Sequence, residues 1–253
     1  MHFKKAPELS ALSLHIAAMT FMLCDHMWAT VVPGNSAWMT CIGRMAYPIF
    51  AFMLVEGFHY TKSRRQYAIR LLVFAVLSEI PFNLMTGGSV VYPFHQNVIW
   101  TFLLAFSFLC ILDRAWKAQK PWIFPAAAAV SIPLGWLLGT ITMVDYYGAG
   151  VLTVFVFYFF RGRRWWQLAG QAAGIFVINC VLLAGLVYPV SVLGLSLEIP
   201  QQSFALGSLI FIWLYRGRQG YHSRAVQLAC YWFYPIHMLV LYLISQVIVM
   251  LSN

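Results

Sequence analysis

The chain has 253 residues, of which 62% are hydrophobic and 9% are charged. A soluble domain has roughly 25% charged residues, and apolar runs of about 20 residues recur to the end of this chain. This composition excludes an ordinary soluble protein and predicts an all-α, polytopic transmembrane helix bundle. The net charge of +9 lies mainly in the connections between apolar runs, where it indicates membrane topology and not binding of nucleic acid.

Nine segments are apolar enough to be predicted as membrane spans. They are residues 12–32, 36–60, 67–86, 97–115, 121–139, 146–160, 166–187, 201–215 and 225–250. Fifteen of the 16 Lys and Arg residues lie at alternate ends of these segments, and Arg44 is the exception. The positive-inside rule then predicts a cytoplasmic N-terminus and an external C-terminus.

The connections are short and contain no linker, so we expect one transmembrane domain over residues 1–253. The polar start of the chain precedes a long apolar run that lacks a small-residue cleavage pattern, which is not typical of a signal peptide. The five cysteines are scattered through apolar runs. That spacing predicts small buried residues and neither a disulfide framework nor a metal site.

Ionisable residues concentrate in the first two predicted spans. Asp25, His26, Arg44, Glu56 and His59 fall within one stretch of the chain, from residue 22 to residue 61. Each ionisable group inside hydrocarbon costs about 2.5 kcal/mol or more, so such residues indicate a functional site by default.

The helical rise of about 1.5 Å per residue places three of the charges at a similar depth in the outer half of the membrane. These are Asp25, Arg44 and Glu79. We predict that Asp25 pairs with Arg44, and that Glu79 completes this network or binds the ammonium group of an acceptor.

Other polar residues are expected to surround an outer cavity and a lower tier. Glu56 and His59 are spaced i,i+3 near the inner end of the second span, so their side chains can touch. His237 lies near the middle of the last span, one turn after Tyr234. The residues assigned to substrate binding are Glu56, His59, Asn83, Asn97, Thr101, Tyr146 and Tyr147.

Six motifs follow one another along the chain: LHIAAMTFMLCDHMW, IGRMAYPIFAFMLVEGFHYTKSRRQYAIRL, LSEIPFNL, YYGAGVL, LYRGRQG and FYPIH. In this order they resemble the TraX family. That family is named after a conjugation protein that acetylates the N-terminus of F-pilin, and the similarity covers nearly the whole chain. The resemblance implies a membrane acetyltransferase that takes the acetyl group from cytoplasmic acetyl-CoA. The polar residues that match the family's pattern are Asp25, His26, Arg44, Glu56, Gly57, His59, Arg70, Glu79, Asn83, Thr101, Gly148 and His237.

Acetyl transfer needs a base, a donor for the oxyanion and a path for the thioester. His26 is the candidate base, because the usual pKa of an imidazole lies near 6.5, and His237 is the rival base. Asp25 cannot readily orient the ring of its neighbour, because consecutive helical residues point about 100° apart. At the inner rim, the residues predicted to contact the phosphates of acetyl-CoA are Arg64, Arg65, Arg70, Arg161 and Arg163. No metal-binding, G-x-S-x-G or P-loop pattern occurs, which argues against a metalloenzyme, a serine hydrolase and an ATP-driven pump.

Two other classes remain to be weighed. A proton-coupled transporter would also bury these charges, although transporters commonly have internal repeats and none is evident here. A scaffold protein would explain neither the outer cavity nor the lower polar tier. The acceptor stays open between a secreted peptide amine, a lipid headgroup and a sugar.

Overall fold

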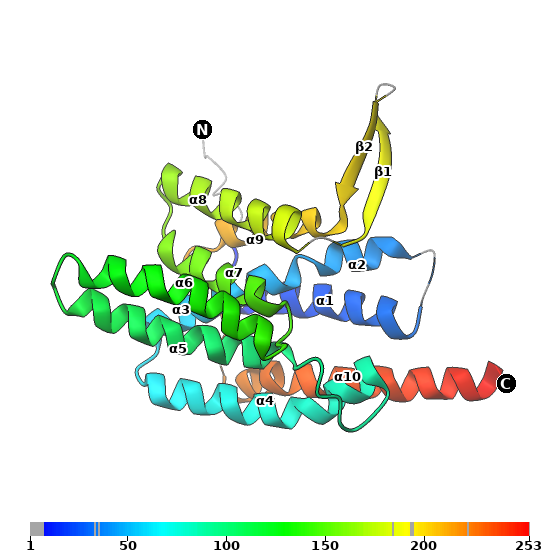
Figure 1. Ribbon diagram of the computed structural model, residues 1–253. Helices are drawn as coiled ribbons and strands as arrows, with labels where there is room; N and C mark the ends of the chain where they lie inside the picture. The colour runs from blue at the N-terminus through cyan, green and yellow to red at the C-terminus, as the bar shows by residue number, and fades with distance from the viewer. Residues whose placement is uncertain are drawn as a thin grey trace, which may run out of the picture.

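The computed structural model describes residues 8–252 except 33, 35, 184, 193–194 and 222. Most of this part of the chain is helical, and the long helices lie roughly along a common direction (Figure 1). The helices are α1 (Ala11–Thr30), α2 (Ala37–Gly43), α3 (Ala46–Tyr60), α4 (Arg64–Gly87), α5 (Val98–Lys117), α6 (Ile123–Ile141), α7 (Tyr147–Phe159), α8 (Trp165–Phe176), α9 (Ser208–Leu214) and α10 (Arg224–Ser252). A π-helical turn, η1 (Val177–Leu182), continues α8, and a 3₁₀ segment, η2 (Gln201–Gly207), precedes α9.

Local sequence signals set several helix ends. Ser63 caps α4 by accepting a hydrogen bond from the backbone N–H of Gln66 at 3.3 Å. Asn97 caps α5 in the same way, accepting from the N–H of Ile99 at 3.0 Å. Both caps satisfy backbone donors that the first helical turn leaves free. At the other end of α4, Gly88 adopts the left-handed conformation (φ 65°), which favours glycine and stops the helix.

The second predicted span is two helices, α2 and α3, interrupted at Arg44 and Met45. Pro48 explains the position of the break. It has no backbone N–H, so it cannot donate the helical hydrogen bond to the carbonyl group of Arg44. Pro48 therefore sits in the first turn of α3, where no such bond is needed, and Arg44 lies at the interruption.

Within the described residues, six helices are long and apolar enough to cross a membrane: Ala37–Tyr60 (α2 with α3), α4, α5, α6, Trp165–Leu182 (α8 with η1) and α10. The helical class and the membrane character are thus as predicted. Helix α7 and the segment from η2 to α9 are shorter apolar helices. Helix α1 has 20 residues but carries His15, Asp25 and His26, and it is not among the six. Nine crossings and the internal N-terminus stay predictions.

The connection predicted at residues 188–200 contains a β-hairpin. Strands β1 (Val187–Val192) and β2 (Leu195–Pro200) pair antiparallel, with Val187 opposite Pro200. The hairpin projects from the bundle beside α2 (Figure 1). It leads directly into η2, which packs on α2.

Helix α3 occupies the centre of the bundle and packs against α1, α5, α7 and α9. Its residues Ile49, Val55 and Phe58 are buried. Helix α10 packs on α4 and α1, but its C-terminal part extends beyond its neighbours (Figure 1). The side chains there, including Val247 and Leu251, are exposed.

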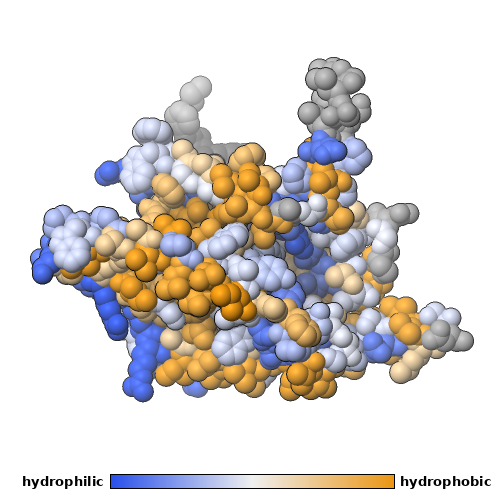
Figure 2. Space-filling view, in the orientation of Figure 1, coloured by the Kyte–Doolittle hydropathy of each residue, from blue (hydrophilic) through white to orange (hydrophobic). Residues whose placement is uncertain are grey.

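Polar residues gather at one end of the bundle. Figure 2 shows hydrophilic side chains at the left end, where the α5–α6 connection and the start of α4 lie in Figure 1, and hydrophobic side chains along much of the middle. This end carries Arg64, Lys117 and Lys120. These residues are among those from which the cytoplasmic side was predicted.

Cysteine labelling tests the orientation. In a variant without the five native cysteines, single cysteines at Val91 and Ser252 should react with an impermeant maleimide from outside intact cells. Cysteines at Arg65 and Lys120 should react only after the membrane is permeabilised. All four positions are exposed, so accessibility of the side chain is not limiting. Labelling of the Arg65 and Lys120 positions from outside would invert the orientation.

Candidate functional site

Arg44 forms the centre of a polar network at the break between α2 and α3. Its guanidinium group makes an ion pair with Asp25 of α1. Its Nε donates to the carbonyl oxygen of Thr40 at 3.2 Å. The hydroxyl of Thr40 also accepts from Nε2 of Gln201 at 3.0 Å, which links η2 to the network. The Arg44 and Asp25 side chains are only 16% and 17% exposed, so the predicted pair exists and is shielded from solvent.

The close approach of α1 to α2 depends on Gly43. A Cβ atom at this position would overlap the side chain of Asp25. The absence of a side chain at Gly43 therefore lets Asp25 reach Arg44.

Asp145, in the α6–α7 connection, forms a second polar group. Its Oδ1 accepts hydrogen bonds from the N–H of Tyr146 at 3.1 Å and from Nε2 of His95 at 3.2 Å. The hydroxyl of Thr101 donates to its backbone carbonyl at 2.7 Å, and its own N–H donates to the carbonyl of Gln96 at 2.9 Å. These contacts join the α6–α7 connection to the residues that lead into α5.

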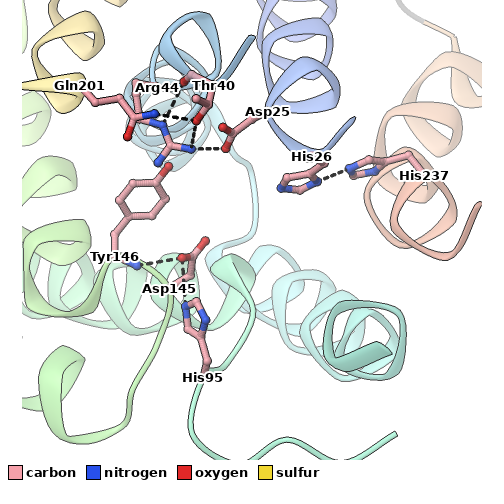
Figure 3. A network of polar contacts seen from close by, with 9 residues as sticks. All are labelled: Asp25, His26, Thr40, Arg44, His95, Asp145, Tyr146, Gln201 and His237. Carbon is pink, nitrogen blue, oxygen red and sulfur yellow. Dashed lines mark hydrogen bonds and ion pairs between the residues drawn. The ribbon is translucent and has the colours of Figure 1, made fainter. Parts of the chain in front are cut away.

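Two consecutive tyrosines beside Asp145 have left-handed backbones. Tyr146 has φ 60° and Tyr147 has φ 49°, a conformation that costs on the order of 1–3 kcal/mol for a non-glycine residue and is common at functional sites. The ring of Tyr146 stacks on that of Tyr47, with 4.1 Å between the ring centroids. Figure 3 shows the side chain of Tyr146 pointing toward Arg44. Tyr147 stacks on His95.

His26 and His237 form a third group. Nδ1 of His26 lies 2.7 Å from Nε2 of His237, and the two rings are nearly parallel, with 6° between their planes. Nδ1 of His237 lies 2.7 Å from the carbonyl oxygen of Phe233. A carbonyl oxygen only accepts, so Nδ1 of His237 carries a hydrogen. In the neutral ring its Nε2 is then an acceptor, and Nδ1 of His26 donates to it.

This arrangement leaves Nε2 of His26 with its lone pair available. If that atom takes a proton, the hydrogen on Nδ1 of His26 can pass to Nε2 of His237. The pair as a whole therefore has room for one additional proton, which enters at His26.

The three groups face a common region (Figure 3), in the half of the bundle that is predicted to be the outer one. They come from α1, the α2–α3 break, α10 and two connections that are distant in sequence. His26 is near enough to Arg44 and Asp145 to interact with their charges. The region thus combines a base, a cation and a carboxylate. No group of three or more potential metal ligands occurs among the described residues.

A large cavity lies on the inner side of this region, between α1, α3, α4 and α10. Its volume is about 780 Å³. Lys62 and Arg70 line its inner part, and Met22, Phe233 and Tyr234 line its deep part. Met22 precedes His26 by one helical turn, and the carbonyl of Phe233 holds His237. Residues about one helical turn from each histidine therefore line the cavity.

The model of the family described as TraX protein matches residues 10–245 of the chain. The chain belongs to the TraX family. It is also 25% identical, over 244 residues, to the probable fimbrial assembly protein FimC, serogroup H1, of Dichelobacter nodosus, and this alignment covers 92% of the chain and 95% of that relative. No solved structure matches the chain. The residues of all three groups lie within the part that matches the TraX family.

Glu79, predicted to complete the Arg44 network, lies elsewhere in this TraX-family chain. Its carboxylate accepts from Nδ2 of Asn97 and, at 3.0 Å, from Nε1 of Trp100. Those two donors are on α5 and its cap, so Glu79 joins α4 to α5. The prediction that it bonds to Asp25 or Arg44 is wrong.

The other predicted outer residues divide into two sets. Thr101, Tyr146 and Tyr147 contact Asp145 or His95 and so border the site. Asn83 is buried and donates to the carbonyl of Val90, which fixes the α4–α5 connection.

Glu56 and His59, the two residues of the predicted lower tier on α3, form no hydrogen bond with each other within the described residues. Glu56 accepts from Nε of Arg161 at 2.7 Å, and the ring of His59 stacks on that of Tyr158. Glu56 lines the inner cavity. Its contact with Arg161 and that of His59 with Tyr158 hold α3 against α7 and the connection that follows it.

Most of the predicted phosphate-binding arginines are engaged within the protein. Arg64 pairs with Asp113, and Arg161 pairs with Glu56. Arg163 donates to two backbone carbonyl groups at the C-terminal end of α9. Arg65 is exposed. Of the five predicted arginines, Arg70 is the one that lines the cavity.

Sequence reasoning missed His95, Gln201 and Lys62. His95 and Gln201 lie in or beside connections, where no helical periodicity gives the direction of their side chains. Lys62 was interpreted only as a topology signal. The helical rise per residue gives the depth of a residue only within a helix, so it does not place side chains in irregular segments.

The Arg44–Asp25 pair should dominate stability at the outer end. Removing one partner of a buried pair leaves the other charge unpaired and costs roughly 3–5 kcal/mol. Arg44→Ala should therefore unfold at a much lower temperature than wild type in detergent, and the double variant with Asp25→Asn should recover part of the loss.

Arg64→Ala is the matched control for this experiment. Its pair with Asp113 leaves 33% of the Arg64 side chain exposed, so the expected loss is about 1 kcal/mol or less. Equal losses for Arg44→Ala and Arg64→Ala would contradict a special role for the outer pair.

The contact between His95 and Asp145 should make stability depend on pH. The hydrogen bond with the Asp145 carboxylate raises the pKa of His95 above its usual range. The pair therefore stabilises the fold fully below about pH 6.5, and this contribution disappears as the pH rises through the raised pKa. The free energies of unfolding of wild type and His95→Gln, obtained from thermal melts, should differ most between pH 5.5 and 6.5, by up to roughly 1 kcal/mol, and should converge above pH 8. A difference that is constant over this range would rule out the ion pair.

Proposed function

We propose that this protein is an acetyltransferase of the bacterial inner membrane. It transfers the acetyl group of cytoplasmic acetyl-CoA to an amine, such as the N-terminus of a pilin-like peptide, in the outer half of the membrane. The observation that carries the proposal is the hydrogen-bonded series from the Phe233 carbonyl through His237 to His26, which leaves Nε2 of His26 available as a base. Membership of the TraX family supports the reaction class.

Each group of the site has a role in this reaction. The acceptor nitrogen attacks the acetyl carbonyl carbon, and its proton passes to Nε2 of His26. The C–S bond then breaks, and the proton held by the histidine pair passes to the departing thiolate, so the products are the acetylated amine and the free thiol, and His26 is neutral again. In the neutral pair His237 accepts from Nδ1 of His26 and fixes the orientation of its ring.

Arg44 is placed to stabilise the negative oxygen that forms during the attack. Its Nε and Nη2 bond to Thr40 and Asp25, whereas its Nη1 makes no hydrogen bond within the described residues. A donor that is already held in place costs little reorganisation when charge develops on the substrate. The pair with Asp25 keeps the guanidinium at this position.

Asp145 favours an amine as the acceptor. Its Oδ1 bonds to His95 and Tyr146, and its Oδ2 has no hydrogen bond with the described part of the chain. A carboxylate at this place attracts an ammonium group more than a sugar hydroxyl. The similarity to a probable fimbrial assembly protein supports a pilin-like peptide over a lipid headgroup.

Mass spectrometry of envelope fractions tests the reaction and the acceptor together. Cells that express the wild type and receive labelled acetate should contain one labelled peptide N-terminus that is absent without the gene. His26→Ala should reduce its formation by about 10²–10⁴-fold, the usual contribution of a general base. His237→Gln, which retains a hydrogen-bond acceptor for His26, should reduce it less than His237→Ala does.

His59→Ala is the control, because this histidine lies at the inner end and stacks on Tyr158. It should leave acetylation near the wild-type rate. Full activity of folded His26→Ala with loss in His237→Ala would assign the base to His237. Full activity in both would contradict the proposed chemistry, and proton uptake without any labelled product would favour a proton-coupled transporter.

A further inference from the structure

The side chains that line the inner cavity are charged or polar in one part and mainly apolar in the other. Lys62, Arg70 and Gln227 lie in its inner part, whereas Met22, Ile99 and Tyr234 line the deep part. Arg70 is six residues from the start of α4 and thus about 9 Å along that helix, and Tyr234 is about 15 Å along α10. Glu56 also lines the inner part but is paired with Arg161, so the charges left unpaired there are the positive ones of Lys62 and Arg70. The part that approaches the histidines is apolar.

Arg70 differs from Arg64 and Arg161 in having no carboxylate partner among the described residues. Arg64 and Arg161 each pair with a carboxylate, but neither Arg70 nor Lys62 forms an ion pair within the described residues. The guanidinium of Arg70 lies over the ring of Tyr67 at 5.4 Å, and its Nε is buried without a hydrogen-bond partner among those residues. A buried donor of this kind is normally satisfied, so an anion that enters the cavity would supply the missing contact.

The shape of the cavity restricts the ligand further. A compact anion would occupy only the charged part and leave the deep part empty. A ligand that fills the whole cavity has a phosphate-bearing end and a long, mainly uncharged arm. The arm would end one helical turn from His26, at the level of Met22 and Tyr234.

We propose that the cavity binds the donor as a coenzyme A thioester, with its phosphates at Lys62 and Arg70 and its pantetheine arm directed toward Tyr234. This assignment rests on the proposed function, and it names the residues that hold the donor. Donor and acceptor then enter from opposite sides, the donor through this cavity and the acceptor through the region between Arg44 and Asp145.

Cys230 provides a direct test, because it lines the cavity. In a purified variant that retains Cys230 and lacks the other four cysteines, acetyl-CoA should slow alkylation by N-ethylmaleimide. Coenzyme A should protect similarly, and pantetheine, which lacks the phosphates, should need a concentration at least tenfold higher. A second variant that retains only Cys110, a residue of α5 outside the lining of the cavity, should show no protection.

Charge variants locate the phosphates. Arg70→Gln should raise the acetyl-CoA concentration that half-protects Cys230 by about tenfold or more, the effect of losing one hydrogen bond to a charged group. Lys62→Gln, which alters an exposed residue and leaves folding intact, should shift it in the same direction. Arg65→Gln is the matched control, because this exposed arginine lies at the same end but outside the cavity. The assignment fails if acetyl-CoA does not protect Cys230, or if Arg65→Gln shifts protection as much as Arg70→Gln and Lys62→Gln.

Measuring both the protection of Cys230 and the formation of acetylated product distinguishes a failure of the proposed donor site from a failure of the proposed transferase activity. Protection of Cys230 without any acetylated product would support the binding site and contradict the transferase. Acetylation by a wild-type protein whose Cys230 is never protected would support the transferase and move the donor to another site.

Discussion

The ion pair between Arg44 and Asp25 is the contact on which the outer half of the structure depends. It joins α1 to the break in the second membrane segment, where Pro48 interrupts the helix and Gly43 admits the carboxylate. Because adjacent helical residues point about 100° apart, fixing Asp25 toward α2 also turns His26 toward α10. One buried pair thereby sets the direction of both the cation and the base.

The opposite side of the site is held by backbone contacts. Residues 143–147 contain three left-handed positions, Met143, Tyr146 and Tyr147, and such a segment persists only when its surroundings determine it. Here Gln96 and Thr101 bond to the main chain of Asp145, and Tyr146 stacks on the buried ring of Tyr47. The site is rigid on this side because a strained connection is anchored to the start of α5.

The sequence was sufficient to predict contacts that depend on depth alone. Asp25 and Arg44 lie at one level in adjacent segments, and they pair. Glu79 lies at a similar level but faces α5, because depth does not give the direction in which a side chain leaves its helix. The basic residues were predicted to mark the inner end, yet Asp113 and Glu56 neutralise Arg64 and Arg161 there. Charge alone therefore did not show which of the arginines lines the cavity. His95 lies in a connection, where neither depth nor helical periodicity applies.

Helix α10 has 29 residues, or about 43 Å of helix, which exceeds a hydrocarbon thickness of about 30 Å. Residues 225–253 contain no Lys, Arg, Asp or Glu, so no charged side chain of this stretch lies at the projecting end of the helix. The level of His237 is therefore set by the packing of α10 on α1 and α4. A thicker or thinner bilayer would change the tilt of the projecting end and leave the two histidines in register.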